Sequence, residues 1–318
     1  SACLVGSEMC IRDSRHTSSD LEGQIYVPVI NWLLGAGVIA LVLAFRHSAK
    51  LADIYGVAVT GTFVLNTILF LAVARALWRT PKWRLALLGA LFLVVELSFF
   101  TSNASKVENG AWLPLVVGLA FAFLMVTWRK GREIVTRNRV AEEGPLDSFL
   151  ERLRSADPPI RRVPGTAIFL SPGKQTTPLA MRAEVERIHA LHEKVVLVSL
   201  DQVSVPHVDP VDRFEVESMG KGHFKIVHVG VRVGYQDRYN VPDTLALARK
   251  RGLLERNLDL EGASYLVSRM TIRETPDRVM NRWRKRLFVA MARNAASPID
   301  TFGLPSERTV MMGSQVPL

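Results

Sequence analysis

The sequence is almost free of cysteine. Its two cysteines, Cys3 and Cys10, both lie within the first ten of 318 residues. Two cysteines in these positions provide neither a disulfide framework nor the ligands of a zinc site. The sequence therefore excludes a disulfide-stabilised scaffold and a cysteine-ligated metal centre.

The first residues also lack the pattern of a secretory signal. The stretch "SACLVGSEMCIRDS" has no basic segment followed by an apolar one, so it is not a signal peptide. It resembles a translated sequencing adapter of the kind found at the ends of assembled gene fragments. We exclude residues 1–14 from fold reasoning, and we expect the natural chain to begin further upstream.

Charged residues are scarce from Tyr26 to Trp128, whereas the chain from Arg129 onward is polar and charged. This division is typical of a protein that is part membrane and part soluble. A bundle of buried helices in a soluble protein is the disfavoured alternative, because such helices need a polar face. Four segments approach or exceed the roughly 20 apolar residues that a membrane-spanning helix needs. These predicted transmembrane helices are residues 27–45, 51–77, 85–101 and 111–128.

Lysine and arginine predict the orientation of these helices, because basic residues concentrate in cytoplasmic connections. Residues 75–84 contain four basic side chains and residues 129–139 contain five, whereas the alternate connections contain only Arg46 and Lys50, and then Lys106. The lead-in 15–26, the loop 75–84 and everything after residue 128 are therefore expected in the cytoplasm. Tryptophans near the helix ends fit an interfacial belt: Trp32, Trp78, Trp83, Trp112 and Trp128.

Polar and small residues interrupt the second predicted helix in "LADIYGVAVTGT", residues 51–62. Ala52, Gly56 and Thr60 recur every four residues, and with Gly61 they predict a small face for close helix packing. Asp53 is expected near the outer surface, where water reaches it. The Tyr55 hydroxyl requires a partner, which is either a neighbouring helix or a dehydrated cation in a pathway.

Glu96 lies near the middle of the third predicted helix, in "LVVELSFF". A carboxylate at this depth takes up a proton or finds a partner, and such groups are typical of ion pathways and proton relays. The alternative is a protonated, hydrogen-bonded glutamic acid that joins two helices. The sequence leaves both readings open.

Several blocks in order resemble the KUP/HAK/KT family of potassium-uptake transporters. The resemblance covers the chain from about Arg15 to Leu318. The blocks are "RHTSSDLEGQIYVPVINWLL", "LADIYGVAVTGT", "VELSFFTSNASKVENGAWLPL", "VTWRKGRE", "RVPGTAIFLS" and "ERTVMMGSQVPL".

The resemblance implies a secondary transporter that moves K⁺ together with H⁺ and uses no cofactor. It implies a fold of twelve helices with broken helices in inverted repeats, of which the four predicted here resemble the last four. Tyr55, Glu96 and Thr60 are then candidates for the ion pathway, and a homodimer is expected. Because the first eight helices have no counterpart here, we expect that this chain alone does not transport potassium.

The soluble half is predicted to comprise a basic linker, residues 129–156, and one cytoplasmic domain, residues 157–318. Strands are expected at 166–171, 194–203 and 263–273, two more in 213–235 around a Gly-Lys-Gly turn, and helices at 178–193 and 242–254. This order predicts an α/β or α+β sandwich with mixed strand pairing.

No catalytic constellation appears in this half. His189, His192 and Glu193 lack a further zinc ligand, and Gly220 to Gly222 lack the spacing of a phosphate-binding loop. The basic amphipathic segment "NRWRKRLFVAMAR", residues 281–293, is expected either on the inner leaflet or docked on its own sheet. The positive net charge does not predict nucleic-acid binding, because proximity to an anionic membrane explains much of it.

Three functions compete on this basis. The first is the C-terminal part of a K⁺/H⁺ symporter in the cytoplasmic membrane. The second is a membrane-anchored enzyme, which the missing catalytic set disfavours. The third is a regulatory module whose soluble domain binds a nucleotide or a partner. We predict the first, with membrane lipid, K⁺ and H⁺ as its partners.

Overall fold

A computed structural model gives the fold of the chain. It describes residues 15–16, 25–105, 110, 112–219, 226–237, 239–255, 257–273, 280–292 and 302–317. The segment 1–14 and the turn from Gly220 to Gly222 lie outside the described residues. Contacts divide the chain into two compact units, one formed by Val29–Val126 and the other by Ser1–Pro28 with Thr127–Leu318.

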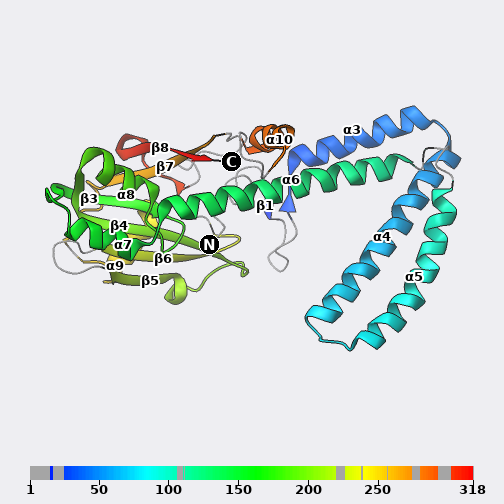
Figure 1. The fold of residues 1–318 in the computed structure, drawn as a ribbon, viewed down its shortest axis with the longest axis horizontal. Helices are drawn as coiled ribbons and strands as arrows, with labels where there is room; N and C mark the ends of the chain where they lie inside the picture. Colours follow the sequence, from blue (N-terminus) through cyan, green and yellow to red (C-terminus); the bar gives the residue numbers. More distant parts are fainter. Residues whose placement is uncertain are drawn as a thin grey trace. The chain divides into compact units, whose positions relative to one another are not determined.

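Four helices in the described part of the chain are long and apolar enough to cross a membrane, by their length and composition. The prediction of four such segments is therefore confirmed. The first two helices lie within three residues of their predicted bounds, the third extends three residues further at each end, and the fourth continues 15 residues past its predicted end. In the first unit, α4 and α5 pack against each other as an antiparallel hairpin (Figure 1). The four helices are α3 (Pro28–Phe45), α4 (Ser48–Ala76), α5 (Lys82–Ala104) and α6 (Trp112–Glu143).

Helix α6 continues without a break from its apolar part into the region predicted as a basic linker. It ends where Gly144 adopts a positive φ of 63°, a conformation that glycine reaches without steric cost. The next helix, α7 (Leu146–Arg154), buries Leu146, Phe149, Leu150 and Leu153 in the core of the following domain. The predicted linker is thus mostly helical, and its second half belongs to the packed domain.

The second unit is built on a six-stranded sheet in the order β5-β6-β4-β3-β7-β8. All neighbouring strands are parallel except β5, which pairs antiparallel with β6 at one edge. The chain adds β4 and β6 on one side of β3 and β7 and β8 on the other, which is a doubly wound arrangement. An α/β domain with mixed pairing is confirmed. The strands are β3 (Arg161–Ser171), β4 (Ala190–Val203), β5 (Phe214–Met219), β6 (Ile226–Gly234), β7 (Ser264–Arg273) and β8 (Thr309–Pro317).

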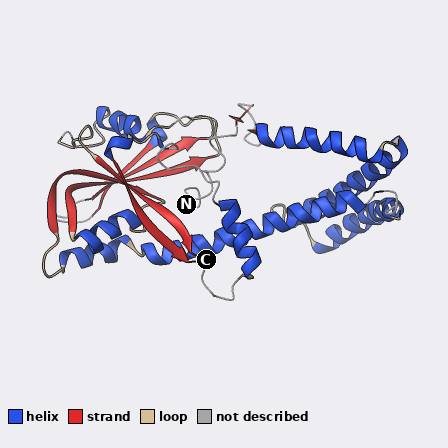
Figure 2. Cartoon of the chain, turned by 90° about the horizontal axis from the view of Figure 1, so that it is seen from above, coloured by secondary structure: helices blue, strands red, loops and turns tan. Residues whose placement is uncertain are grey.

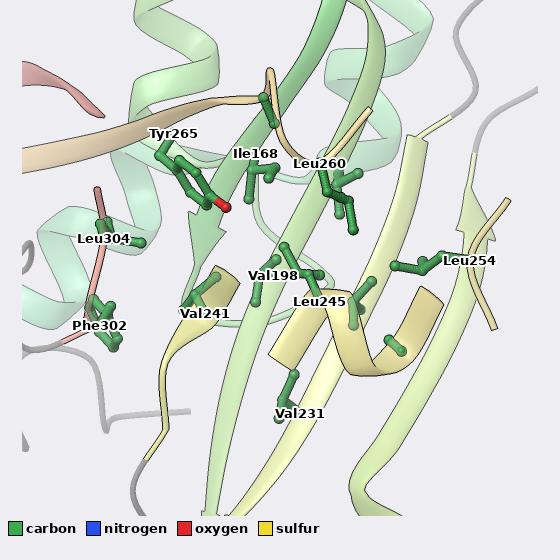
Figure 3. Packing of buried hydrophobic residues seen from close by; sticks show 14 of the residues in the cluster. Ile168, Val198, Val231, Val241, Leu245, Leu254, Leu260, Tyr265, Phe302 and Leu304 are labelled. Carbon is green, nitrogen blue, oxygen red and sulfur yellow. The ribbon is translucent and has the colours of Figure 1, made fainter. Parts of the chain in front are cut away.

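Each face of the sheet has its own hydrophobic core, because successive strand residues point to opposite faces. Helix α9 (Val241–Lys250) covers one face, where Leu245 packs with Ile168 and Val198 (Figure 3). Helices α7 and α8 (Leu179–Ala183) cover the other face. Figure 2 shows helices on both sides of the sheet. The central strands β3 and β4, which have other strands on both sides, read as near-continuous apolar runs in the sequence.

The helix predicted over residues 178–193 is confirmed as far as Ile188 and is wrong in its last four residues. Helix α8 passes into a π-helical segment, η2 (Glu184–Ile188), and ends where His189 adopts a left-handed φ of 53°. Residues 190–193 begin β4 and pair in parallel with the first residues of β3. The spacing of their apolar residues fits a helix, but they form a strand because they can make backbone hydrogen bonds to β3, about 30 residues earlier in the chain.

Helix α10 (Arg282–Ala292) packs against α6 within the second unit. Phe288 is 2% exposed, and its ring centroid lies 5.2 Å from that of Trp128. Gly131 allows this approach, because a Cβ there would overlap the Phe288 ring. Arg284 Nε donates a hydrogen bond of 3.3 Å to Thr127 Oγ1. Of the two sequence-based alternatives, docking on the sheet is confirmed only in part. Ile272 of β7 packs against the same cluster, in which Ile134 and Val135 of α6 are buried with Phe288.

Candidate functional site

Glu96 lies in the interface between α4 and α5. Thr67 Oγ1, on α4, donates a hydrogen bond of 2.8 Å to Glu96 Oε1. The second oxygen, Oε2, is buried and has no hydrogen-bond partner within the described part of the chain. A carboxyl group placed in this way can hold a proton on Oε2, or it can offer that oxygen to a cation.

A stripe on α5 positions this carboxyl group. Gly89, Glu96 and Asn103 are spaced seven residues apart, close to two helical turns, and therefore share one face. Gly89 faces Leu71 of α4, with 3.1 Å from an ideal Cβ to Leu71 Cδ1. Asn103 faces Gly56, where an ideal Cβ would lie 2.8 Å from Asn103 Oδ1. The two small residues let the helices approach, so that the polar groups between them can meet.

The structure does not gather the predicted pathway residues into one cluster. Thr60 Oγ1 donates 2.7 Å to the carbonyl oxygen of Gly56 in its own helix. Thr60 and Tyr55 precede Thr67 by seven and twelve residues, about 10 and 18 Å along α4. The Tyr55 side chain is 70% exposed. Glu96 is thus brought together with Thr67, a residue the sequence analysis did not single out, and a pathway role for Tyr55 and Thr60 stays a prediction.

The predicted packing residues of α4 lie in different environments. Gly61 lies against Phe100, with 3.4 Å from an ideal Cβ to Phe100 Cε2. Gly56 lies against Asn103, as described above, whereas Ala52 is exposed. Asp53 is half-buried. The seven-residue spacing on α5 is the signal that could have found Asn103 from sequence.

A second polar cluster, which the sequence analysis missed, lies on the face of the sheet that α7 and α8 cover. Ser199 Oγ on β4 lies 3.0 Å from His228 Nε2 on β6, and both residues are buried. Glu217 on β5 is the register partner of His228. Lys174, from the segment after β3, forms ion pairs of 3.0 Å with Glu215 and Glu217. Three strands and one connection therefore converge here.

Electrostatics differ between the buried and exposed members of this cluster. Burial lowers the pKa of His228, and this effect outweighs the nearby Glu217. Hydrogen bonds to Glu217 and Glu215 raise the pKa of Lys174, and Lys174 in turn lowers the pKa of Glu215. The cluster thus favours a neutral imidazole beneath a charged lysine–glutamate surface.

The burial of His228 predicts a pH-dependent stability. Its folded-state pKa is below the unfolded value, so the unfolded chain takes up the proton first as pH falls below about 6.5. The stabilisation from the neutral imidazole is therefore present above that pH and is lost below it. We expect the melting temperature of the α/β domain, followed by circular dichroism, to fall between pH 7.5 and 5 less steeply in His228→Asn than in the parent chain.

A matched histidine variant separates this effect from general acid sensitivity. His189 is exposed, and asparagine tolerates its left-handed backbone. His189→Asn should leave the pH slope of the parent unchanged. An equal slope in His228→Asn and the parent would contradict the assignment, whereas a uniform destabilisation of about 1–3 kcal/mol would report only the lost hydrogen bond.

The sequence disfavoured a zinc site at His189 and His192, and the structure shows where these two histidines lie. His192 lies on β4, and its Nδ1 is 2.8 Å from Glu184 Oε1. His189 ends the helical segment and is exposed. Within the described ranges, no group of three or more His, Cys, Asp or Glu side chains could hold a metal ion.

Four apolar helices followed by an α/β domain define a multi-pass membrane protein with a soluble domain, and comparisons with known proteins specify its class. Residues 9–133 match the integral membrane domain of the K⁺ potassium transporters, and residues 164–318 match their C-terminal domain. The chain belongs to the KUP/HAK/KT family of potassium transporters. No solved structure gives a significant match.

Individual relatives agree with the family models. A "probable potassium transport system protein Kup" of Rhodococcus jostii is 44% identical over 301 residues, covering 95% of this chain and 46% of the relative. Relatives with the same name from Cutibacterium acnes and from an Anaeromyxobacter species are 41% and 43% identical, covering 96% of this chain and 47% and 45% of the relatives. The chain thus spans about half the length of the curated relatives it matches. The prediction of a transporter family rather than an enzyme is confirmed.

Proposed function

We propose that this chain serves potassium uptake coupled to proton entry, as a part of a transporter of the length of its relatives. The observation that carries the proposal is Glu96, whose carboxyl group lies between two apolar helices with one oxygen bonded to Thr67 and the other buried. Carboxyl groups at such depth are costly, by about 2.5 kcal/mol or more, and are typical of ion pathways.

The finer features of the proposal come from the family. They are broken helices in inverted repeats, the α/β domain in the cytoplasm, a homodimer and no cofactor. The basic residues at 75–84 and after residue 128 support the cytoplasmic orientation. In this class of transporter the substrate lies near the midplane of the bilayer, at the interface between the repeats.

A chimaera tests this function directly. Residues 15–318 would replace the matching segment of the Rhodococcus jostii relative in bacteria that lack their own potassium uptake. We expect Rb⁺ uptake within a few-fold of the parent relative, together with alkalinisation of the medium as protons enter. Rb⁺ uptake without alkalinisation of the medium would contradict the coupling to protons but not the uptake of potassium. Absence of uptake at normal membrane abundance, beside an active parent relative, would contradict the transport function of this segment.

The topology of the sheet also favours the regulatory alternative, in which the soluble domain binds a nucleotide or a partner. In doubly wound sheets, ligands bind beyond the carboxyl ends of the strands where the winding direction changes. That point lies here between β3 and β7, next to the segment 172–178. A rise in the melting temperature of the chain on addition of nucleotides would support this role, and an unchanged value across adenine and guanine nucleotides would count against it.

A further inference from the structure

Helix α10 is fixed close to the end of the last apolar helix. Its contacts on α6 begin at Thr127 and Trp128 and continue through Gly131 to Ile134 and Val135. Trp128 is the last residue of the apolar run, in the position of an interfacial tryptophan. The docking site of α10 therefore starts where the hydrocarbon is expected to end.

The geometry of α6 sets the depth of this docking site. With a rise of about 1.5 Å per residue, Gly131 and Val135 lie about 4.5 and 10 Å beyond Trp128 along the helix. The headgroup layer on each side of a bilayer is about 5–8 Å thick. The contacts of α10 on α6 consequently span the headgroup layer and end just beyond it, for a membrane that ends near Trp128.

The charge of α10 fits this layer. The helix contains Arg282, Arg284, Lys285 and Arg286 and no acidic residue. Arg282 and Arg286 are exposed, and the Trp283 side chain is 57% exposed beside them. The apolar side of α10 is already used, because Phe288 is buried against α6. What remains is a cationic surface with one aromatic side chain, which is the composition of a membrane-interface helix.

The adjoining surface of α6 adds a groove of about 570 Å³ with further arginines. Guanidinium groups hold phosphate through paired hydrogen bonds, and an apolar floor suits the start of an acyl chain. The groove has both features within the first three turns after the apolar run. It is lined by Trp128, Arg129, Arg132, Glu133, Thr136, Arg137 and Val140.

We propose that α10 and this groove of α6 form a binding surface for the anionic phospholipids of the cytoplasmic leaflet. Phosphate groups lie against the arginines, and Trp283 enters the boundary between headgroups and acyl chains. The proposal rests on the cytoplasmic orientation in the proposed function, because anionic lipids attract basic residues at that surface. It assigns to α10 a role in holding the α/β domain at the membrane, apart from any role in transport.

A depth measurement on the reconstituted chain tests the proposal. A nitroxide would be attached at Trp283→Cys in a Cys3→Ser/Cys10→Ser background, in nanodiscs containing phosphatidylglycerol and phosphatidylethanolamine. We expect the label to be more accessible to oxygen than to a water-soluble nickel complex, as at the headgroup boundary. Val211→Cys, at an 84% exposed position of the domain, serves as the water-accessible control. Equal nickel accessibility at both positions would overturn the proposal.

A charge variant tests the lipid preference by native mass spectrometry of the whole chain. Arg282→Gln/Arg286→Gln should weaken phosphatidylglycerol binding on the order of tenfold, since each basic residue contributes to attraction by an anionic surface. Arg187→Gln/Arg232→Gln removes the same charge from exposed positions elsewhere on the domain and should leave binding unchanged. Equal losses of phosphatidylglycerol binding in the two variants would refute a specific binding surface at α10. Equal binding of phosphatidylcholine by the parent chain would refute the preference for anionic lipid.

The two measurements also separate this proposal from the proposed function. Both leaflets of the nanodisc have the same composition, so neither result depends on orientation in the cell or on potassium transport. A chimaera without uptake and a chain with a lipid-seated label would reject transport and retain the lipid surface. An active chimaera together with a water-accessible label at position 283 would reject only the lipid surface.

Discussion

Replacing Glu96 with glutamine in the transport-competent chimaera should reduce Rb⁺ uptake at least about tenfold while membrane abundance stays within about twofold, because the glutamine keeps the shape of the side chain but cannot ionise. The Thr67 hydroxyl can still donate its hydrogen bond to the amide oxygen, so the contact between α4 and α5 is retained. Uptake would be followed by Rb⁺ flux at several external pH values, with abundance from quantitative blotting.

Thr67→Val is the matched control for this variant. It removes the hydroxyl that bonds Glu96 Oε1 but keeps the carboxyl group itself in place. We expect it to lower stability by about 1 kcal/mol and to reduce uptake less than Glu96→Gln does. Wild-type uptake and pH dependence in Glu96→Gln would exclude a role in proton or cation handling. Parallel losses of uptake and abundance in both variants would make Glu96 a packing residue only.

Tyr55→Phe is a milder companion variant in the same chimaera. An unchanged K⁺ affinity in this variant would assign Tyr55 to packing.

Gly131→Ala should detach α10 from α6. An alanine gains up to about 1 kcal/mol in helix propensity, but its Cβ overlaps the Phe288 ring, and overpacking costs about 1–3 kcal/mol. Because Phe288 is buried and the backbone of α6 is regular, the ring must move and α10 must move with it. We expect hydrogen–deuterium exchange across Arg282–Ala292 to accelerate several-fold to about a hundredfold in the detergent-solubilised chain.

Two variants make this result specific. Gly118→Ala lies in the same helix where no atom is within 4 Å of an added Cβ, so it should leave exchange in α10 unchanged. Gly131→Ala combined with Phe288→Leu, which removes part of the overlapping ring, should restore part of the protection. If Gly131→Ala protects α10 as well as Gly118→Ala does, then the close packing of α10 on α6 is contradicted.

The elements that sequence predicted best are those determined by local composition. A run of about 20 apolar residues is typical of a membrane-spanning helix, because its length matches the hydrocarbon thickness. The four predicted segments correspond to α3 to α6. The continuous apolar runs of β3, β4 and β7 were equally readable, because parallel strands are buried on both faces. Glu96 stood out for the same local reason, as a carboxyl group in an apolar run.

The elements that sequence missed depend on distant partners. Residues 190–193 have helical spacing, yet they join β4 because β3 offers them a ladder. Strand β8 contains Gly313 and Ser314 in its interior, which weakens any strand pattern, and its pairing with β7 defines it. The docking of α10 on α6 brings together segments about 150 residues apart. Gly131 makes it possible, because a larger residue there would overlap the Phe288 ring.

The candidate site shows the same limit. Glu96 was identified from its own sequence context, but its partner Thr67 resembles the other threonines of α4 until α5 is packed against it. The spacing along α5 indicates the face on which Asn103 lies, but its contact with Gly56 is known only from the packing of the two helices. The cluster of Ser199, His228 and Glu217 assembles from three strands, and no single segment carries its pattern.

The hydrogen bond between Thr67 and Glu96 joins α4 to α5 through one carboxyl oxygen only. The threonine hydroxyl donates to Oε1, and the buried Oε2 is left without a partner in the described part of the chain. A proton on Oε2 would leave Oε1 able to accept the same hydrogen bond. The contact between the two helices can therefore persist in either charge state of this side chain.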